Sequence, residues 1–338
     1  MQPAIRRKLF GLGAVLLVFL VGLAWFFILG PGQRKPGPPS TYGIHEDHPG
    51  DLQAGLDITD NVRNYGLPQD LPYQFTTTPL GFRGPPAKAG DSPKVIVLGD
   101  SFVFGMGVDD KQTFPHQLEV ALRTHGLASA SVHNGGVPGY TVVDLEEQWK
   151  EKLETFKPDW VVLCHNGSDL KEMARPYSLR RLMRFDAVNP ERDDEEIRAL
   201  INASDSRQEA IRSHFIFPEQ QLWERLKRDR KQVETLRSDY IMGVLRLRDL
   251  VERTGARFAT VLWVRRYTLA ELDVTPVYDA LKDAQIAVFQ AEAAMHAQSE
   301  VPPGALYLPD RHFSPAGNRI TAQQTAAWLV DIFTEQDI

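Results

Sequence analysis

The chain has 338 residues, of which 43% are hydrophobic and 24% are charged, and its formal net charge is -6. These proportions are ordinary for a globular protein, so they exclude general disorder and a collagen-like fibre. The mild acidity argues against nucleic acid as a partner, because phosphate binding needs a concentrated basic surface. The single cysteine, Cys164, excludes an intrachain disulfide and a zinc site built from several thiolates.

Residues 9–30 form an apolar segment that no charged side chain interrupts. As a helix it would span about 30 Å, the thickness of the hydrocarbon core of a bilayer. Arg6, Arg7 and Lys8 precede it, so the positive-inside rule predicts a cytoplasmic N-terminus and an exported body. A cleaved signal peptide is the alternative, but it usually has a shorter apolar core and an A-x-A-like site. We therefore expect residues 1–30 to be an uncleaved, single-pass membrane anchor.

Residues 31–88 are predicted to connect this anchor to the body of the protein. The stretch 31–41 is rich in proline and glycine, which is typical of a linker. Residues 42–88 form a lead-in segment without clear periodicity, in which only 73–76 resembles a short edge strand.

The body, residues 89–338, alternates patterns typical of strands and helices. Short apolar runs rich in β-branched residues predict buried strands at 94–98, 130–134, 160–164 and 257–264. Helical patterns cover residues 114–122, 144–156 and 314–333. Strands that alternate with helices imply an α/β fold, a three-layer sandwich in which helices cover both faces of a central parallel sheet.

A charged region at about residues 170–255 separates the third and fourth predicted strands and is far longer than an ordinary crossover. It contains helix-compatible stretches, so we expect a helical insertion. The insertion is either a solvated appendage or a lid near the substrate, since ligands of open α/β sheets bind beyond the carboxyl ends of the strands.

Ser101 follows the first predicted strand directly, in Gly99-Asp100-Ser101-Phe102. A serine between a buried strand and a helix can present its hydroxyl at the edge of the sheet, and its backbone N–H can face an oxyanion. The flanking residues fit neither a G-x-S-x-G elbow nor a phosphate-binding P-loop. An ordinary turn, in which Asp100 and Ser101 make local backbone bonds, is the simpler alternative.

Asp310 and His312 lie two residues apart just before the last predicted helix. A serine nucleophile needs a base, and the base needs a carboxylate that orients it. This spacing lets the carboxylate reach the imidazole without a third segment. Taken alone, the pair could equally be a surface histidine near a helix N-terminus.

Together these motifs resemble the SGNH/GDSL hydrolase family over residues 90–170 and 255–333. The matching positions, in the family's order along the chain, are Ser101, Gly139, the approach to the third block at 157–163, and the pair Asp310 and His312. The resemblance implies a flavodoxin-like fold, a nucleophile at Ser101 and an oxyanion-hole N–H at Gly139. Residues 81–84, Gly-Phe-Arg-Gly, are also similar to a lead-in of some membrane-anchored relatives.

Two positions depart from the family's pattern. The third block normally places an asparagine in the oxyanion hole, but Ser168 stands at that position here. Either the Ser168 hydroxyl or the Asn166 amide could complete the hole. The family's acid usually precedes the base by three residues, whereas Asp310 precedes His312 by two, as in relatives that act on envelope polysaccharides.

The resemblance implies acyl transfer without a metal or an organic cofactor. Ser101 would attack an ester, with His312 as the base and Asp310 as its orienting acid, while Tyr140 and His165 are candidates to line the substrate cleft. We expect an esterase for a small acyl group such as acetyl, with an acylated envelope polysaccharide as one candidate substrate. Its body would lie on the periplasmic side of a bacterial inner membrane. The alternatives are an O-acyltransferase on the same scaffold and a catalytically weak binding or assembly protein.

Overall fold

The computed structural model of the chain describes residues 51–62, 70–86, 92–166, 168–175, 217–263, 275–291 and 301–335, together with residues 199, 202–205, 209, 210, 213 and 294. The predicted anchor at 1–30 and the linker at 31–41 lie outside the described residues. Within these ranges no helix is long and apolar enough to cross a membrane.

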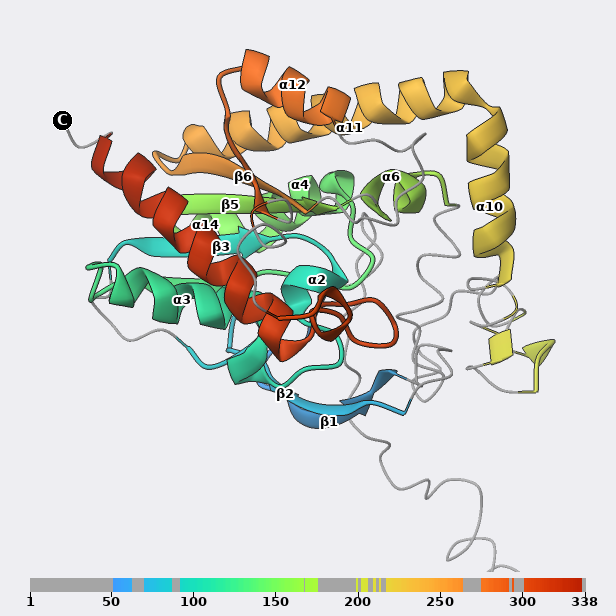
Figure 1. Cartoon of the computed structure of the whole chain (residues 1–338), viewed down its shortest axis with the longest axis horizontal. Helices are drawn as coiled ribbons and strands as arrows, with labels where there is room; N and C mark the ends of the chain where they lie inside the picture. Colours follow the sequence, from blue (N-terminus) through green and yellow to red (C-terminus); the bar gives the residue numbers. More distant parts are fainter. Residues whose placement is uncertain are drawn as a thin grey trace, which may run out of the picture. The chain divides into compact units, whose positions relative to one another are not determined.

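A parallel sheet of five strands forms the centre of the body, in the order β4-β3-β5-β6-β7. Figure 1 labels β3, β5 and β6 of this sheet. Its strands are β3 (Lys94–Leu98), β4 (Ser131–Asn134), β5 (Trp160–Asn166), β6 (Arg257–Trp263) and β7 (Ala287–Gln290). The four strands predicted from the sequence are confirmed. The edge strand β7 is not predicted, because it has only four residues, all of them partly buried.

Helices cover both faces of this sheet (Figure 1). Successive residues of a strand point to opposite faces. In β3, Val95 and Val97 accordingly belong to one hydrophobic cluster, while Ile96 and Leu98 belong to the other. The first cluster includes side chains of α3 (Phe114–Thr124) and α14 (Pro315–Glu335), and the second includes side chains of α4 (Val142–Gln148) and α11 (Arg230–Glu252). The predicted sheet between two helical layers is confirmed.

Further helices accompany these layers in the described part of the chain. They are α2 (Ser101–Phe104), α5 (Glu154–Phe156), α6 (Ser168–Met173), α10 (Phe217–Arg228) and α12 (Thr275–Asp283), with 3-10 turns at Asp110–Gln112 and Pro303–Ala305. The helix predicted at 144–156 is α4, followed by a π-helical turn at Trp149–Leu153 and then α5. It ends where Lys157 adopts a left-handed conformation (φ 51°). The next residue, Pro158, has no backbone N–H and so cannot donate the hydrogen bond that would continue the helix.

The region predicted as an insertion is in part a layer of the fold. Helix α11, which joins this region to β6, buries Tyr240, Val244, Leu247 and Val251 in the second cluster. The charged side chains between these residues dominate the local composition, although the buried ones recur at helical spacing. The last part of the predicted insertion, which extends to about residue 255, therefore contains a core helix.

The lead-in segment forms an antiparallel pair of strands, β1 (Asp57–Asn61) and β2 (Pro72–Thr76). The predicted edge strand at 73–76 is β2, and it buries Tyr73 and Phe75. The Phe75 ring lies 5.2 Å from the ring of Phe104 in α2, with the two rings edge to face. The packed body thus begins before the predicted boundary at residue 89.

Candidate active site

Ser101 is the first residue of the one-turn helix α2, at the carboxyl end of β3. Asp100 caps this helix, because its Oδ1 accepts a hydrogen bond from the Phe102 N–H at 2.9 Å. Gly99 allows α2 to approach the sheet closely, since a Cβ there would lie 2.6 Å from Val103 Cγ2 and 2.9 Å from the Cys164 carbonyl oxygen. The sequence Gly-Asp-Ser thus places Ser101 at the carboxyl edge of the sheet.

His312 lies within hydrogen-bond distance of both Ser101 and Asp310. Its Nε2 is 2.8 Å from Ser101 Oγ, and its Nδ1 is 2.8 Å from Asp310 Oδ2. In the neutral tautomer that suits these partners, Nδ1–H donates to the carboxylate and the serine O–H donates to Nε2. The structure brings the three predicted catalytic side chains together into one hydrogen-bonded chain.

A tight turn lets the Asp310 carboxylate reach the His312 ring although only one residue separates them. Arg311, between them, adopts a left-handed conformation with φ 74°, which is uncommon for a residue with a Cβ. The His312 N–H donates to Asp310 Oδ1 at 3.2 Å, and its carbonyl accepts from the Leu308 N–H at 2.7 Å. The Asp310 side chain is fully buried and that of His312 is 13% exposed.

Aromatic packing fixes the imidazole from the side. The Phe102 ring lies 4.8 Å from the His312 ring, and it contacts Phe313 edge to face at 5.2 Å. Phe102 follows Ser101 directly, so the residue that carries the hydroxyl is coupled to the residue that supports its base. The base can therefore change its side-chain rotamer only if this aromatic contact is lost.

The backbone N–H groups of Ser101 and Gly139 are the two that the sequence predicts for an oxyanion hole. Among the described residues, no acceptor is found for the N–H of Ser101 or of Gly139. The loop that carries Gly139 is tied to the serine loop, because the Val137 N–H donates to the Gly99 carbonyl at 3.0 Å. Gly139 has φ 68°, a conformation that glycine adopts without strain.

The Asn166 and Ser168 side chains are instead engaged with Asp100. Asn166 is buried, and its Nδ2 donates to Asp100 Oδ2 at 2.9 Å. The Ser168 hydroxyl donates to Asn166 Oδ1, with Asp100 Oδ2 at 3.4 Å. Both residues therefore brace the serine loop, and the hydroxyl proton of Ser168 already has acceptors. Sequence alone does not indicate this, because the pattern of the third block gives no orientation of these side chains.

Tyr140 and His165 do not lie on an accessible surface, which corrects their prediction as residues of the substrate cleft. Tyr140 is 1% exposed and belongs to the core, and His165 is fully buried. The His165 ring packs 4.2 Å from the ring of Tyr240 on α11, and its Nδ1 lies 2.5 Å from Asp169 Oδ2. Both positions are adjacent to functional loops in sequence, but their side chains point into the protein.

The residues that the structure describes contain no group of three His, Cys, Asp or Glu side chains that could hold a metal ion. Cys164 is buried at the end of β5 next to Asp100 and Asp169, and burial raises the pKa of its thiol well above the ordinary value. Such a thiol is a poor nucleophile, because the thiolate is the reactive form. Ser101 is thus the nucleophile candidate that this edge of the sheet presents.

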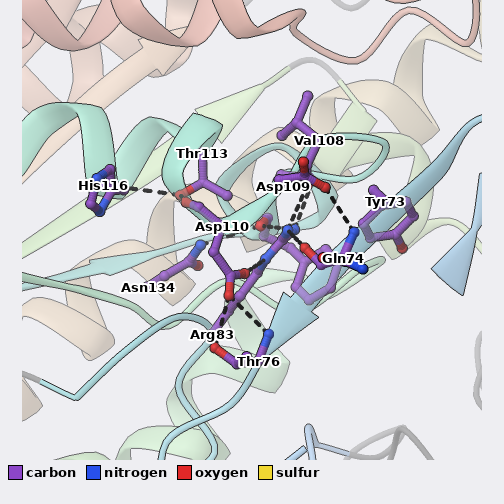
Figure 2. A network of polar contacts seen from close by, with 12 residues as sticks. Tyr73, Gln74, Thr76, Arg83, Val108, Asp109, Asp110, Thr113, His116 and Asn134 are labelled. Carbon is purple, nitrogen blue, oxygen red and sulfur yellow. Dashed lines mark hydrogen bonds and ion pairs between the residues drawn. The ribbon is translucent and has the colours of Figure 1, made fainter. Parts of the chain in front are cut away.

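Arg83 lies in the stretch that resembles a family lead-in. It is a further residue near the site, and the sequence does not indicate its contacts. Its side chain is fully buried and reaches the carbonyl groups at the end of α2 (Figure 2). The flanking glycines in Gly81-Phe82-Arg83-Gly84 are a signal of a special backbone, since Gly81 and Gly84 both have positive φ. That signal does not reveal the partner of the arginine.

The hydrogen-bonded chain of Ser101, His312 and Asp310 at one sheet edge has the geometry that a serine-dependent acyl hydrolase needs. The family described as the GDSL-like lipase/acylhydrolase family matches residues 97–320, which is more than half of the chain. The chain belongs to this family, and it is an ester hydrolase by class. No curated protein matches it.

Many solved structures are similar to the chain, and three of them illustrate the likeness. A protein assigned to the G-D-S-L lipolytic family from Desulfitobacterium hafniense is 14% identical over 70% of this chain and 99% of its own, with a TM-score of 0.44. A catalytic mutant of an acetylxylan esterase from Geobacillus stearothermophilus is 19% identical over 70% and 93%, with a TM-score of 0.38. The esterase EstA from Pseudoalteromonas sp. is 9% identical over 72% and 100%, with a TM-score of 0.45.

The buried carboxyl of Asp169 yields a prediction about stability. Burial raises its pKa from 3.8 to about 6, while His165 has the opposite effect. The folded protein then keeps a proton that the unfolded chain releases, so this contribution to stability is complete below about pH 4 and lost by about pH 6. The loss amounts to about 3 kcal/mol.

We expect Asp169→Asn to remove this pH dependence. The difference in free energy of unfolding between the variant and the unmodified chain, measured with urea, should change by about 3 kcal/mol between about pH 4 and pH 6. Above that window the difference should be constant, which provides an internal control. A difference that stays constant across the window would contradict the raised pKa.

Proposed function

We propose that this protein hydrolyses esters of small acyl groups through a Ser101-His312-Asp310 triad. The observation that carries the proposal is the continuous chain of hydrogen bonds, 2.8 Å at each step, from the Ser101 hydroxyl through the imidazole to the Asp310 carboxylate. A surface histidine near a helix N-terminus would have no reason to lie between a serine hydroxyl and a fully buried carboxylate.

In the first step Ser101 Oγ bonds to the ester carbonyl carbon while His312 Nε2 takes the hydroxyl proton. The carbonyl oxygen gains negative charge, which the N–H groups of Ser101 and Gly139 stabilise. Asp310 keeps Nδ1 protonated and stabilises the imidazolium. His312 then returns the proton to the departing alcohol, which leaves an acyl-serine.

Water completes the cycle: it now attacks the acyl carbon, and Ser101 is the leaving group. His312 takes a proton from the water, the hydroxide oxygen bonds to the acyl carbon, and the carbon–Oγ bond breaks as Ser101 recovers its proton. A sugar hydroxyl in place of water would make the protein an O-acyltransferase. No feature of the described residues favours a second acceptor over water, so hydrolysis is the function that we propose.

We propose acetyl esters of an envelope carbohydrate as the substrate class. The support is the Asp-x-His spacing at residues 310–312, which resembles relatives acting on such polymers, and the apolar segment at residues 9–30, which would hold the body near the envelope. The segment and its basic N-terminal flank support an inner-membrane protein whose body faces the periplasm.

Replacement of the nucleophile tests the proposed function. The full chain in detergent should hydrolyse p-nitrophenyl acetate, and Ser101→Ala should lower kcat by at least about a thousandfold, because the residual rate comes from binding and the oxyanion hole alone. Ser131→Ala is the matched control, since Ser131 is buried on β4 with no partner for its hydroxyl among the described residues. It should keep full activity.

Activity that survives Ser101→Ala would refute the nucleophile assignment. A properly folded, unmodified chain that turns over none of a panel of acyl esters would favour the binding or assembly alternative. Acyl transfer to an added oligosaccharide that outruns hydrolysis would favour the transferase.

A second substitution tests which donors stabilise the oxyanion. Because the Ser168 proton is engaged with Asn166 and Asp100, Ser168→Ala should lower kcat by less than about tenfold. Loss of a true oxyanion donor lowers kcat by about a hundredfold to a thousandfold. A fall of that larger size, with KM unchanged, would show that the Ser168 hydroxyl turns toward the substrate and would contradict the two-donor hole.

The membrane location is tested by fractionation. In a bacterial host the full chain should remain in the membrane pellet after alkaline carbonate washing, and external protease should digest its body in spheroplasts but not in intact cells. A chain that starts at residue 36 should leave the membrane fraction, because it lacks the apolar segment. Carbonate-extractable full-length chain, or a body protected in spheroplasts, would overturn the proposed location.

A further inference from the structure

The Arg83 side chain, which is fully buried, donates hydrogen bonds in three directions (Figure 2). Its Nη1 donates to the carbonyl oxygens of Phe104 at 2.8 Å and Gly105 at 2.7 Å. Its Nη2 donates to the Val108 carbonyl at 2.5 Å, and its Nε donates to Asp110 Oδ1 at 2.9 Å. One guanidinium thus binds the backbone around the end of α2 and a carboxylate just beyond it.

This position couples Arg83 to Ser101 through a single helical turn. Phe104 and Gly105 end α2, and their N–H groups donate to the carbonyls of Asp100 and Ser101 at 3.0 Å. One turn of helix rises only about 5.4 Å, so displacement of its last residues must displace its first. Whatever fixes the Phe104 and Gly105 carbonyls therefore also fixes the serine.

Arg83 also holds the loop that follows β4. Its backbone N–H donates to the Asn134 carbonyl at 3.0 Å, and the Asn134 side-chain amide donates to the same Phe104 carbonyl at 3.2 Å. Asn134 Oδ1 in turn accepts from the Gly136 N–H at 3.0 Å, on the loop that leads to Gly139. Arg83 and Asn134 thus join the nucleophile turn to the proposed oxyanion loop.

The lead-in strand β2 lies against this guanidinium and shares its carboxylate. Asp110 Oδ2 accepts from the Thr76 N–H at 2.9 Å and from its hydroxyl at 2.8 Å, while Asp109 Oδ1 accepts from the Gln74 N–H at 2.8 Å (Figure 2). The Arg83 Cζ lies 5.5, 5.4 and 4.5 Å from the ring centroids of Tyr73, Phe75 and Phe104. An arginine is required by this geometry, since a lysine ammonium cannot span the separate acceptors.

We propose that Arg83 is a positioning residue that sets Ser101 in register with the oxyanion loop, in the reaction proposed above. Stability alone is a weak reason for such a group, because a buried ion pair often contributes no more than apolar side chains of similar volume. Placement of a reactive serine is a stronger one, since a displacement of about 1 Å at a catalytic group can lower a rate about a hundredfold. The proposal makes the lead-in strands a part of the catalytic machinery's support.

The test compares Arg83→Lys and Arg83→Met with the unmodified full chain in detergent. A fluorophosphonate probe is allowed to react to completion, which counts competent sites, and the rate constant of that reaction reports the alignment of Ser101. We expect kcat per counted site and the phosphonylation rate constant to fall together, by about tenfold to a hundredfold, with KM within about threefold. In Arg83→Ala, added methylguanidinium should restore part of kcat.

The matched control is Arg246→Lys, which alters an arginine–carboxylate pair between α11 and Glu146 on α4. It should leave kcat per counted site unchanged. A merely structural role for Arg83 would lower the unfolding temperature and the number of competent sites but leave kcat per site and the phosphonylation rate constant normal, and that result would overturn the proposal. If Arg83→Met does not fold, Arg83→Lys and Asp110→Asn still decide the question by the same readouts.

Failure of this proposal is distinguishable from failure of the proposed function. Ser101→Ala reacts with the probe only if another residue is the nucleophile, which would refute the triad itself. Normal labelling of Ser101 in the unmodified chain together with unchanged rates in Arg83→Lys would refute the positioning role alone.

Discussion

The site depends on a one-turn helix, α2, that is held at both ends. At its start the Asp100 carboxylate caps the helix and accepts from Asn166, which connects the serine loop to the end of β5. At its end Arg83 and Asn134 bind the Phe104 carbonyl. An isolated helix this short is unstable in water, because nucleation fixes several residues for one hydrogen bond. Its geometry is therefore set by its neighbours rather than by its own sequence.

Two His–Asp pairs in the same protein illustrate how environment assigns a role. His312 keeps a partly accessible ring, Asp310 on one nitrogen and Ser101 on the other. His165 has a similar carboxylate contact with Asp169 but is fully buried under Tyr240, and its Nε2 has no partner among the described residues. The same residue types thus form a partly accessible hydrogen-bond partner of a serine in one place and a buried packing element in the other.

Local patterns are sufficient to predict the strands β3 to β6 and to place Ser101 and Asp310-Arg311-His312 at loops that meet. Parallel strands carry their following loops to the same edge, so the meeting of Ser101 and His312 is a consequence of fold class. The orientation of a buried side chain is not local. Asn166 and Ser168 turn toward Asp100, and α11 is a core helix despite its charged surface, because partners distant in sequence determine both.

The family matches the chain from residue 97, but residues before this position are packed against the matched part. The strands β1 and β2 and residue Arg83 precede the match, yet β2 and Arg83 contact Phe104, the last residue of α2. A fragment cut at residue 97 would keep Ser101, Asp310 and His312 but lose Arg83 and the strand β2, both of which contact Phe104. Phe104, which is fully buried in the whole chain, would then be exposed to water, so the packed unit extends beyond the residues that the family matches.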